Sequence, residues 1–145
     1  MKKTIRNCLV LLLFLVIATI LMQKLGWTGV VPNFDEDALT VTGPQKFSFT
    51  VDYDQIAALE LVELDGYGDL ISGGESRTYA WGVRENGAWG RYTLCVAQKT
   101  AETVLITTRE GERFAFNYQD SQTTQDICEM FEELLDHRAE DKPEP

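Results

Sequence analysis

The chain from about residue 38 onward consists of short segments rich in β-branched and aromatic residues, separated by turn-forming residues. In RYTLCVA at 91–97, the alternation places Tyr92, Leu94 and Val96 on one side, as in a strand that buries one face. This pattern predicts a mainly β body. The clearest segments are LTVT at 39–42, FSFTV at 47–51, RYTLCVA at 91–97, TVLITT at 103–108 and RFAFNY at 113–118.

One further segment, IAALELVELD at 56–65, is ambiguous. Its Ala, Leu and Glu content suits a helix, whereas its neighbours and the glycine-rich stretch after it suit a strand, and we expect a strand. Turns are expected at Gly43-Pro44 and in the REGE sequence at 109–112. About six or seven antiparallel strands follow from these signals, without β-α-β alternation.

The last regular element expected is an amphipathic helix. Asp120 and Ser121 are cap residues, and the apolar residues that follow recur at helical spacing. Such a stripe packs on a sheet, so we expect this helix to close the open end of a small bent sheet or barrel. The stripe consists of Ile127, Met130, Phe131, Leu134 and Leu135.

Several of these runs together resemble the bacterial pleckstrin-homology-like domain family, over roughly residues 40–135. They are YDQIAALELVELD at 53–65, RTYAWG at 77–82, GAWGRYTLCV at 87–96, VLITTREGERFAFNYQD at 104–120 and EELL at 132–135. The resemblance implies two near-orthogonal antiparallel sheets closed by a C-terminal helix. It also implies a small, often membrane-attached bacterial protein without settled biochemistry. Eukaryotic domains of this fold often bind phosphoinositides through basic residues in the first loop between strands. Here that loop, GPQK at 43–46, has only Lys46, so phosphoinositide binding is not supported.

The N-terminus has the layout of a signal peptide or an uncleaved anchor: MKKTIRN precedes an uncharged run at 8–22. These 15 residues cover about 22 Å as a helix, less than the roughly 30 Å of a hydrocarbon layer, which favours a signal peptide. No A-x-A cleavage pattern follows, however. The segment 5–27 is long enough to span if the side chains of Arg6 and Lys24 reach the interfaces and Trp27 lies at the far one.

We therefore interpret residues 1–28 as a single-pass membrane anchor, with a cleaved signal as the alternative. The basic N-terminal end places the rest of the chain outside the cytoplasm. Residues 29–37 are expected to form a linker, 38–137 the pleckstrin-homology-like domain, and 138–145 an acidic disordered tail.

The charge of the body argues against nucleic acid as a partner. Four of the 13 Lys and Arg residues lie within the first 24 positions, which leaves nine against 23 acidic residues, a net charge of −14. A nucleic-acid-binding domain needs a basic face. Broad electrostatic adhesion to anionic lipid is disfavoured for the same reason.

The sequence offers no catalytic, metal or cofactor constellation. Seven of the 11 glycines lie at 66–90, but the carboxylates of Asp69 and Glu75 follow them where a phosphate would bind, so turns and bulges explain them better. His137, the single histidine, lies at the end of the expected helix. Cys95 and Cys128 are interpreted as two buried thiols, with a disulfide as the alternative. We therefore expect a non-enzymatic protein without cofactors.

One group of side chains remains as a contact surface. Aromatic and arginine side chains are the usual anchors of protein interfaces, although they are also ordinary sheet residues. On a body placed outside the cytoplasm, these aromatic and arginine side chains predict an extracytoplasmic protein-binding or scaffolding module. The alternative is a sensor of a small ligand, such as a lipid or a cell-wall fragment, that uses Trp81 and Trp89. The set consists of Tyr79, Trp81, Trp89, Arg77, Arg84 and Arg91.

Overall fold

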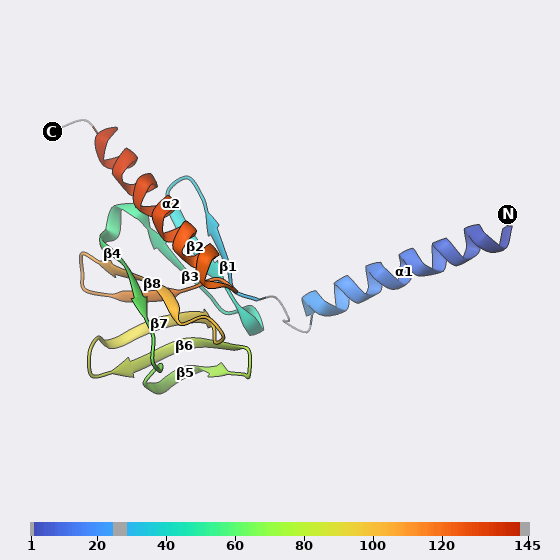
Figure 1. The fold of residues 1–145 in the computed structure, drawn as a ribbon, viewed down its shortest axis with the longest axis horizontal. Coiled ribbons are helices and arrows are strands. Elements are labelled where there is room, and N and C mark those ends of the chain that lie inside the picture. The colour runs from blue at the N-terminus through green and yellow to red at the C-terminus, as the bar shows by residue number, and fades with distance from the viewer. Residues whose placement is uncertain (1, 25–28, 143–145) are drawn as a thin grey trace.

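The computed structural model describes the backbone of residues 2–24 and 29–142, and the side chains of 10–21 and 29–142. Helix α1 (Lys2–Lys24) leads away from a β body that ends in helix α2 (Ser121–Glu140), as Figure 1 shows. The described residues form nine strands in two sheets. The predicted mainly β body with a C-terminal helix is therefore confirmed.

The smaller sheet contains β1 (Val31–Phe34), β2 (Ala38–Thr42) and β3 (Ser48–Asp52), all antiparallel in the order β1-β2-β3. The expected Gly43-Pro44 turn joins β2 to β3 through the short 3₁₀ helix η1 (Pro44–Lys46). Strand β1 lies within residues 29–37, so the prediction of a linker is wrong for the residues of this strand. The reason is apolar burial: Val30 is fully buried, and Phe34 packs edge-on against Phe131 with ring centroids 5.1 Å apart.

The larger sheet has the order β4-β8-β9-β7-β6-β5. A short 3₁₀ helix, η2 (Tyr53–Gln55), connects β3 to its first strand. The ambiguous segment 56–65 forms a strand over most of its length, as expected. The six strands are β4 (Ile56–Glu63), β5 (Asp69–Glu75), β6 (Tyr79–Asn86), β7 (Gly90–Ala97), β8 (Glu102–Thr108) and β9 (Arg113–Phe116).

Strands β7 and β9 are parallel, so the expectation of antiparallel strands alone is wrong. The hairpin of β8 and β9 inserts β9 between β8 and β7. Asn117, directly after β9, hydrogen-bonds to the end of β7 and to the connection that follows it. Its side-chain amide donates to the carbonyls of Ala97 and Thr100 at 3.0 and 2.9 Å, and its oxygen accepts from the Ala97 amide at 2.7 Å.

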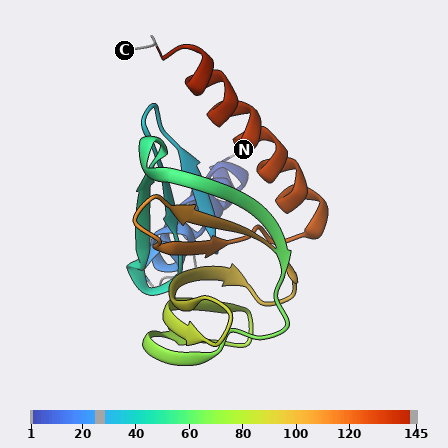
Figure 2. The same cartoon turned by 90° about the vertical axis from the view of Figure 1, so that its left-hand side faces the viewer.

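The two edge strands of the larger sheet, β4 and β5, are consecutive in the chain. Six strands laid flat span about 24 Å, whereas the connection at 64–68 reaches about 20 Å when extended. The sheet therefore has to curl, and Figure 2 shows this connection descending from β4 past the body to β5.

Apolar clusters lie on both faces of the larger sheet. The first fills the space between the two sheets and α2, and includes Leu39, Ile106, Phe116 and Phe131. The second lies on the opposite face. The three side chains predicted to share one side of β7 belong to it, which confirms the strand alternation. Its buried members are Ala80, Tyr92, Leu94, Val96, Leu105 and Ala115.

The glycine-rich stretch 66–90 contains β5, β6 and the turn that leads to the first residue of β7, with a bulge in β5 at 70–72. Gly73 and Gly82 are paired across β5 and β6 with φ of +104° and +110°, and a Cβ on either would overlap the other strand's backbone. Glycine is required at both positions because of this close approach. This confirms the interpretation as turns and bulges.

Helix α2 begins at Ser121, and Asp120 caps it by accepting a hydrogen bond from the Thr123 amide at 2.7 Å. Phe131 is fully buried, but Met130 is 45% exposed, so Met130 does not belong to the packed stripe. The helix continues through residue 140, so the disordered tail predicted for 138–145 is wrong at its start. The guanidinium of Arg138 donates to the Glu36 carbonyl at 2.7 Å and so fixes this turn to the body.

Helix α1 occupies most of the predicted anchor at 1–28, and the apolar side chains along 10–21 are largely exposed, Phe14 by 74%. The side chains of Arg6 and Lys24, and Trp27 as a whole, lie outside the described residues. Within the described part of the chain, none of the helices is both long and apolar enough to cross a membrane.

Candidate functional site: a groove between an edge strand and the C-terminal helix

The aromatic and arginine residues predicted as a contact surface do not form one patch. Trp81 is only 7% exposed and belongs to the cluster between the sheets, and Tyr79 packs against the same cluster. Trp89 lies against the cluster on the opposite face, edge-on to Tyr92 with centroids 5.1 Å apart. These rings are part of the packing of the fold, which was the other interpretation of the same residues.

Arg84 is buried and acts as a cross-link between strands. One guanidinium nitrogen lies 3.3 Å from a Glu75 carboxylate oxygen, and another donates to the Gly74 carbonyl at 3.1 Å. The guanidinium also lies over the Tyr67 ring, 5.9 Å from its centroid. Burial, followed by the nearby Glu75 carboxylate, raises the pKa of Tyr67, and Arg84 partly offsets this rise. Arg84 therefore holds β5 and the 64–68 connection onto β6.

The other two arginines are exposed. Arg91 pairs with Glu85 across β6 and β7 at 3.3 Å, and Arg77 lies in the turn between β5 and β6. Since both side chains of the Arg91–Glu85 pair are more than half exposed, the pair adds little to stability. Neither arginine lies beside the two tryptophans on a common surface.

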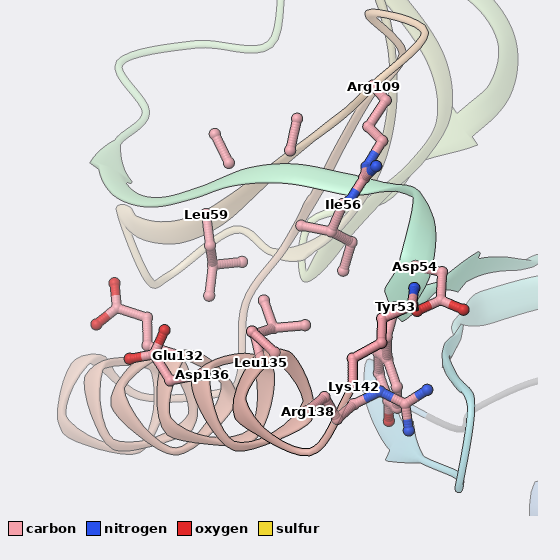
Figure 3. A pocket seen from close by; sticks show the side chains of 13 residues that line it. Tyr53, Asp54, Ile56, Leu59, Arg109, Glu132, Leu135, Asp136, Arg138 and Lys142 are labelled. Atoms are coloured by element: carbon pink, nitrogen blue, oxygen red, sulfur yellow. Dashed lines mark ion pairs between the residues drawn. The ribbon is translucent and has the colours of Figure 1, made fainter. Parts of the chain in front are cut away.

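A groove of about 610 Å³ lies instead between β4 and α2 (Figure 3). Strand β4 and helix α2 run in opposite directions along its two sides. Its apolar part is formed by Ile56 and Leu59 from β4 and Leu135 from α2, whose side chains point toward one another. A smaller hollow of about 340 Å³ shares Asp54, Arg138 and Lys142 with the groove and extends it toward the end of α2.

The two ends of the groove differ in charge. At one end, Glu132 and Asp136 project from successive turns of α2, and neither forms an ion pair with a described residue. At the other end, Arg138 and Lys142 lie together at the end of α2, and Arg109 lies apart from them, beside β4 next to Ile56.

Acidic partners compensate two of these three cations. Arg138 contacts Asp37 at 3.2 Å and Lys142 contacts Asp54 at 3.6 Å. Arg109 has no ion pair within the described part of the chain. The groove is therefore acidic along one half of α2, with one uncompensated cation beside β4.

Tyr53 fixes the basic end of the groove in place. Its hydroxyl donates to the Asp35 carbonyl at 2.8 Å, and the Arg138 guanidinium lies over its ring, 5.1 Å from the centroid. Burial and the Asp35 carboxylate raise the pKa of Tyr53, so this hydroxyl remains a donor at neutral pH. The contact joins η2 to the last turn of α2 and sets the width of the groove at this end.

Cys95, Cys128 and His137 are not among the residues that line the groove. Cys95 and Cys128 are free, buried thiols, as interpreted from the sequence, and burial raises their pKa to about 12 and about 11. Such thiols stay protonated at neutral pH and are weak nucleophiles. His137 is exposed at the end of α2, 3.9 Å from Glu140. Over the described residues, no three His, Cys, Asp or Glu side chains are grouped as metal ligands.

No protein-family model, curated protein or solved structure matches this chain. The groove therefore has to be interpreted from its own geometry. Its residues come from three distant segments, 53–59, 109 and 132–142, and no motif in the sequence predicts it. The one local signal was Leu135, which lies in the predicted apolar stripe.

Proposed function

We propose that this chain is a membrane-attached, non-enzymatic protein-binding module. The observation that carries the proposal is the groove between β4 and α2, because it lies beside the open edge of the larger sheet. An open edge strand offers unpaired backbone groups to another chain. Apolar side chains flanked by charges add the selectivity that a protein partner requires.

The apolar surface of α1 supports membrane attachment. From Val10 to Leu21 most apolar side chains are about half exposed or more, and they point in all directions around the helix. A helix that is apolar on every side requires a core or a bilayer around it. The basic residues at 2–6 support an extracytoplasmic body. Proteolysis of intact cells tests this topology, and a body protected until lysis would contradict it.

A pleckstrin-homology-like architecture is part of the proposal. Two sheets with a C-terminal helix support it, together with the sequence runs at 53–120 that resemble that family. The parallel pairing of β7 and β9 departs from the purely antiparallel sheets that the resemblance implies. The alternative of a small-ligand sensor that uses Trp81 and Trp89 loses support, because Trp81 is buried between the sheets.

Site-specific photo-crosslinking in the native cells tests the protein-binding function. A photoreactive phenylalanine analogue replaces Ala58, which is exposed in the groove, and in a matched variant it replaces Arg77, which is exposed in the predicted contact surface. We expect a discrete crosslinked protein at Ala58 and none at Arg77. The absence of a crosslink at Ala58, or identical products from both positions, would refute the assignment of the groove.

A further inference from the structure

We propose that the groove takes an extended segment of a partner protein, added as a further strand on β4. A lysine or arginine of the segment lies beside Glu132 and Asp136, and an apolar side chain lies between Leu59 and Leu135. This inference rests on the proposed protein-binding function and specifies the chemistry of the partner. Four observations support it: the free backbone groups, the absence of proline and lysine from the edge, the apolar part of the groove and its charges.

The backbone of β4 has a definite set of free groups. Leu64 donates its amide to the Ala101 carbonyl at 3.0 Å, and hydrogen-bonded pairs alternate along an antiparallel ladder. The paired register then makes Val62 and Glu60 hydrogen-bond to β8. The amide and carbonyl groups of Leu59 and Leu61 therefore point away from β8, toward the free edge. An incoming strand requires this spacing of donors and acceptors.

The edge of β4 is only partly protected against pairing. Proteins often block edge strands with proline, with charged side chains, lysine above all, or with a bulge. The sequence IAALELVE of β4 contains neither proline nor lysine; its charges are Glu60 and Glu63, and its one irregularity, between Ile56 and Ala58, leaves the register regular from Ala58 onward. The small side chains of Ala57 and Ala58 leave room at the groove. Helix α2 on the opposite side restricts the space to a narrow, extended ligand.

The apolar part of the groove selects one side chain of such a segment. Leu59 and Leu135 are both only partly buried by the fold, and they face each other from β4 and α2 (Figure 3). An apolar side chain between them removes this remaining surface from water, which is the main favourable term in peptide binding.

The charges determine which residue flanks this apolar side chain. Glu132 and Asp136 are exposed, four residues apart on α2, without a cationic partner among the described residues. Electrostatic complementarity therefore favours lysine or arginine at this end. The body carries a net charge of −14 outside the four basic residues of the first 24, which further favours a basic segment.

Selection from a random seven-residue peptide library on phage tests the inference, with the full chain held in detergent micelles. The wild type is compared with a double variant, Glu132→Lys with Asp136→Lys. We expect the wild type to enrich peptides with lysine or arginine next to an apolar residue, and the double variant to enrich aspartate or glutamate there. Enrichment of acidic peptides by the wild type, or the same peptides from both proteins, would overturn the charge assignment.

A second pair of variants tests strand addition. Leu61→Pro removes an amide that faces the free edge, whereas Leu61→Ala trims the same side chain and retains the amide. One lost hydrogen bond should weaken a selected peptide by about three- to tenfold in Leu61→Pro relative to Leu61→Ala, measured by fluorescence anisotropy. Both variants should keep the unfolding transition of the wild type. Equal affinities would refute strand addition.

Other outcomes separate this inference from the proposed function. If no peptide is enriched, the extended-segment inference fails, while a crosslink at Ala58 would still establish a folded partner at the groove. If the full chain sediments as a dimer that Leu61→Pro alone dissociates, a second copy occupies the edge, and the inference of a basic partner segment is overturned.

Discussion

The substitution Phe131→Ala should be among the most damaging changes to the body, because Phe131 joins three elements in the core between the two sheets and α2. Its ring is fully buried, 5.1 Å from the Phe34 ring of β1 and 5.9 Å from the Tyr53 ring of η2. Truncating a buried phenylalanine removes its transfer free energy and leaves a cavity, at a cost of about 3–5 kcal/mol. A small domain has a total stability of roughly 5–15 kcal/mol, so the change removes a large share of it.

The assay is thermal and urea unfolding of the full chain in detergent micelles, followed by tryptophan fluorescence, since buried Trp81 reports on the core. At about 4 °C per kcal/mol for a domain of this size, we expect the midpoint to fall by roughly 12–20 °C. Met130→Ala is the matched control: this neighbour is 45% exposed, and its loss should cost about 0.5 kcal/mol or less. A Phe131→Ala cost below about 1 kcal/mol, or equal to that of Met130→Ala, would refute the packing of α2 described above.

Four further predictions use the same unfolding assays or simple chemistry. Gly82→Ala should cost about 2 kcal/mol because its φ is +110° and the β5 backbone lies against it, whereas Gly87→Ala, with open space around it, should be nearly neutral in urea unfolding. Asn117→Ala should cost about 3 kcal/mol by loss of three buried hydrogen bonds, and a cost below about 1 kcal/mol would contradict their importance. The pKa of Asp120 is lowered below its usual 3.8 by the Thr123 amide, so its charge stabilises the fold above that pH and ceases to do so as the pH falls through the lowered value. Thermal unfolding of wild type and Asp120→Asn should accordingly differ at neutral pH and converge in acid, and a constant difference would contradict this. Cys95, with its pKa raised to about 12 by burial, should react with iodoacetamide at pH 8 only after unfolding, as mass spectrometry would show.

The elements with strong local signals could be predicted from the sequence. The alternation in RYTLCVA determines which side chains of β7 meet in the core, and the cap at Asp120 determines where α2 begins. Both signals lie within a few residues of the feature that they predict. Met130 departs from the predicted stripe because helical spacing predicts which residues share a face of the helix, but not which of them the fold buries. The buried residue next to that face of α2 is Cys128.

The pairing of distant strands could not be predicted in this way. Strand β1 contains Pro32 and lies within a segment that resembles a linker, and it becomes a strand only because β2 is present to pair with it. The parallel contact of β7 with β9 similarly depends on where the β8–β9 hairpin inserts. Asn117 makes that insertion stable, yet an asparagine after a strand is an ordinary turn signal in the sequence.

The same reasoning explains why the aromatic and arginine residues predicted as a contact surface do not gather on one face. Tryptophan and arginine are frequent interface anchors, but a curled sheet with a cluster on each face has enough interior to bury Trp81 and Arg84. What exposes a surface here is topology: β4 becomes an edge because β8 and β9 pair as a hairpin and leave β4 a neighbour on one side only. Its free backbone groups, with α2 beside them, form a groove from residues that carry no motif individually. A binding site of this kind depends on strand order, so a sequence can reveal it only after the pairing of its strands is known.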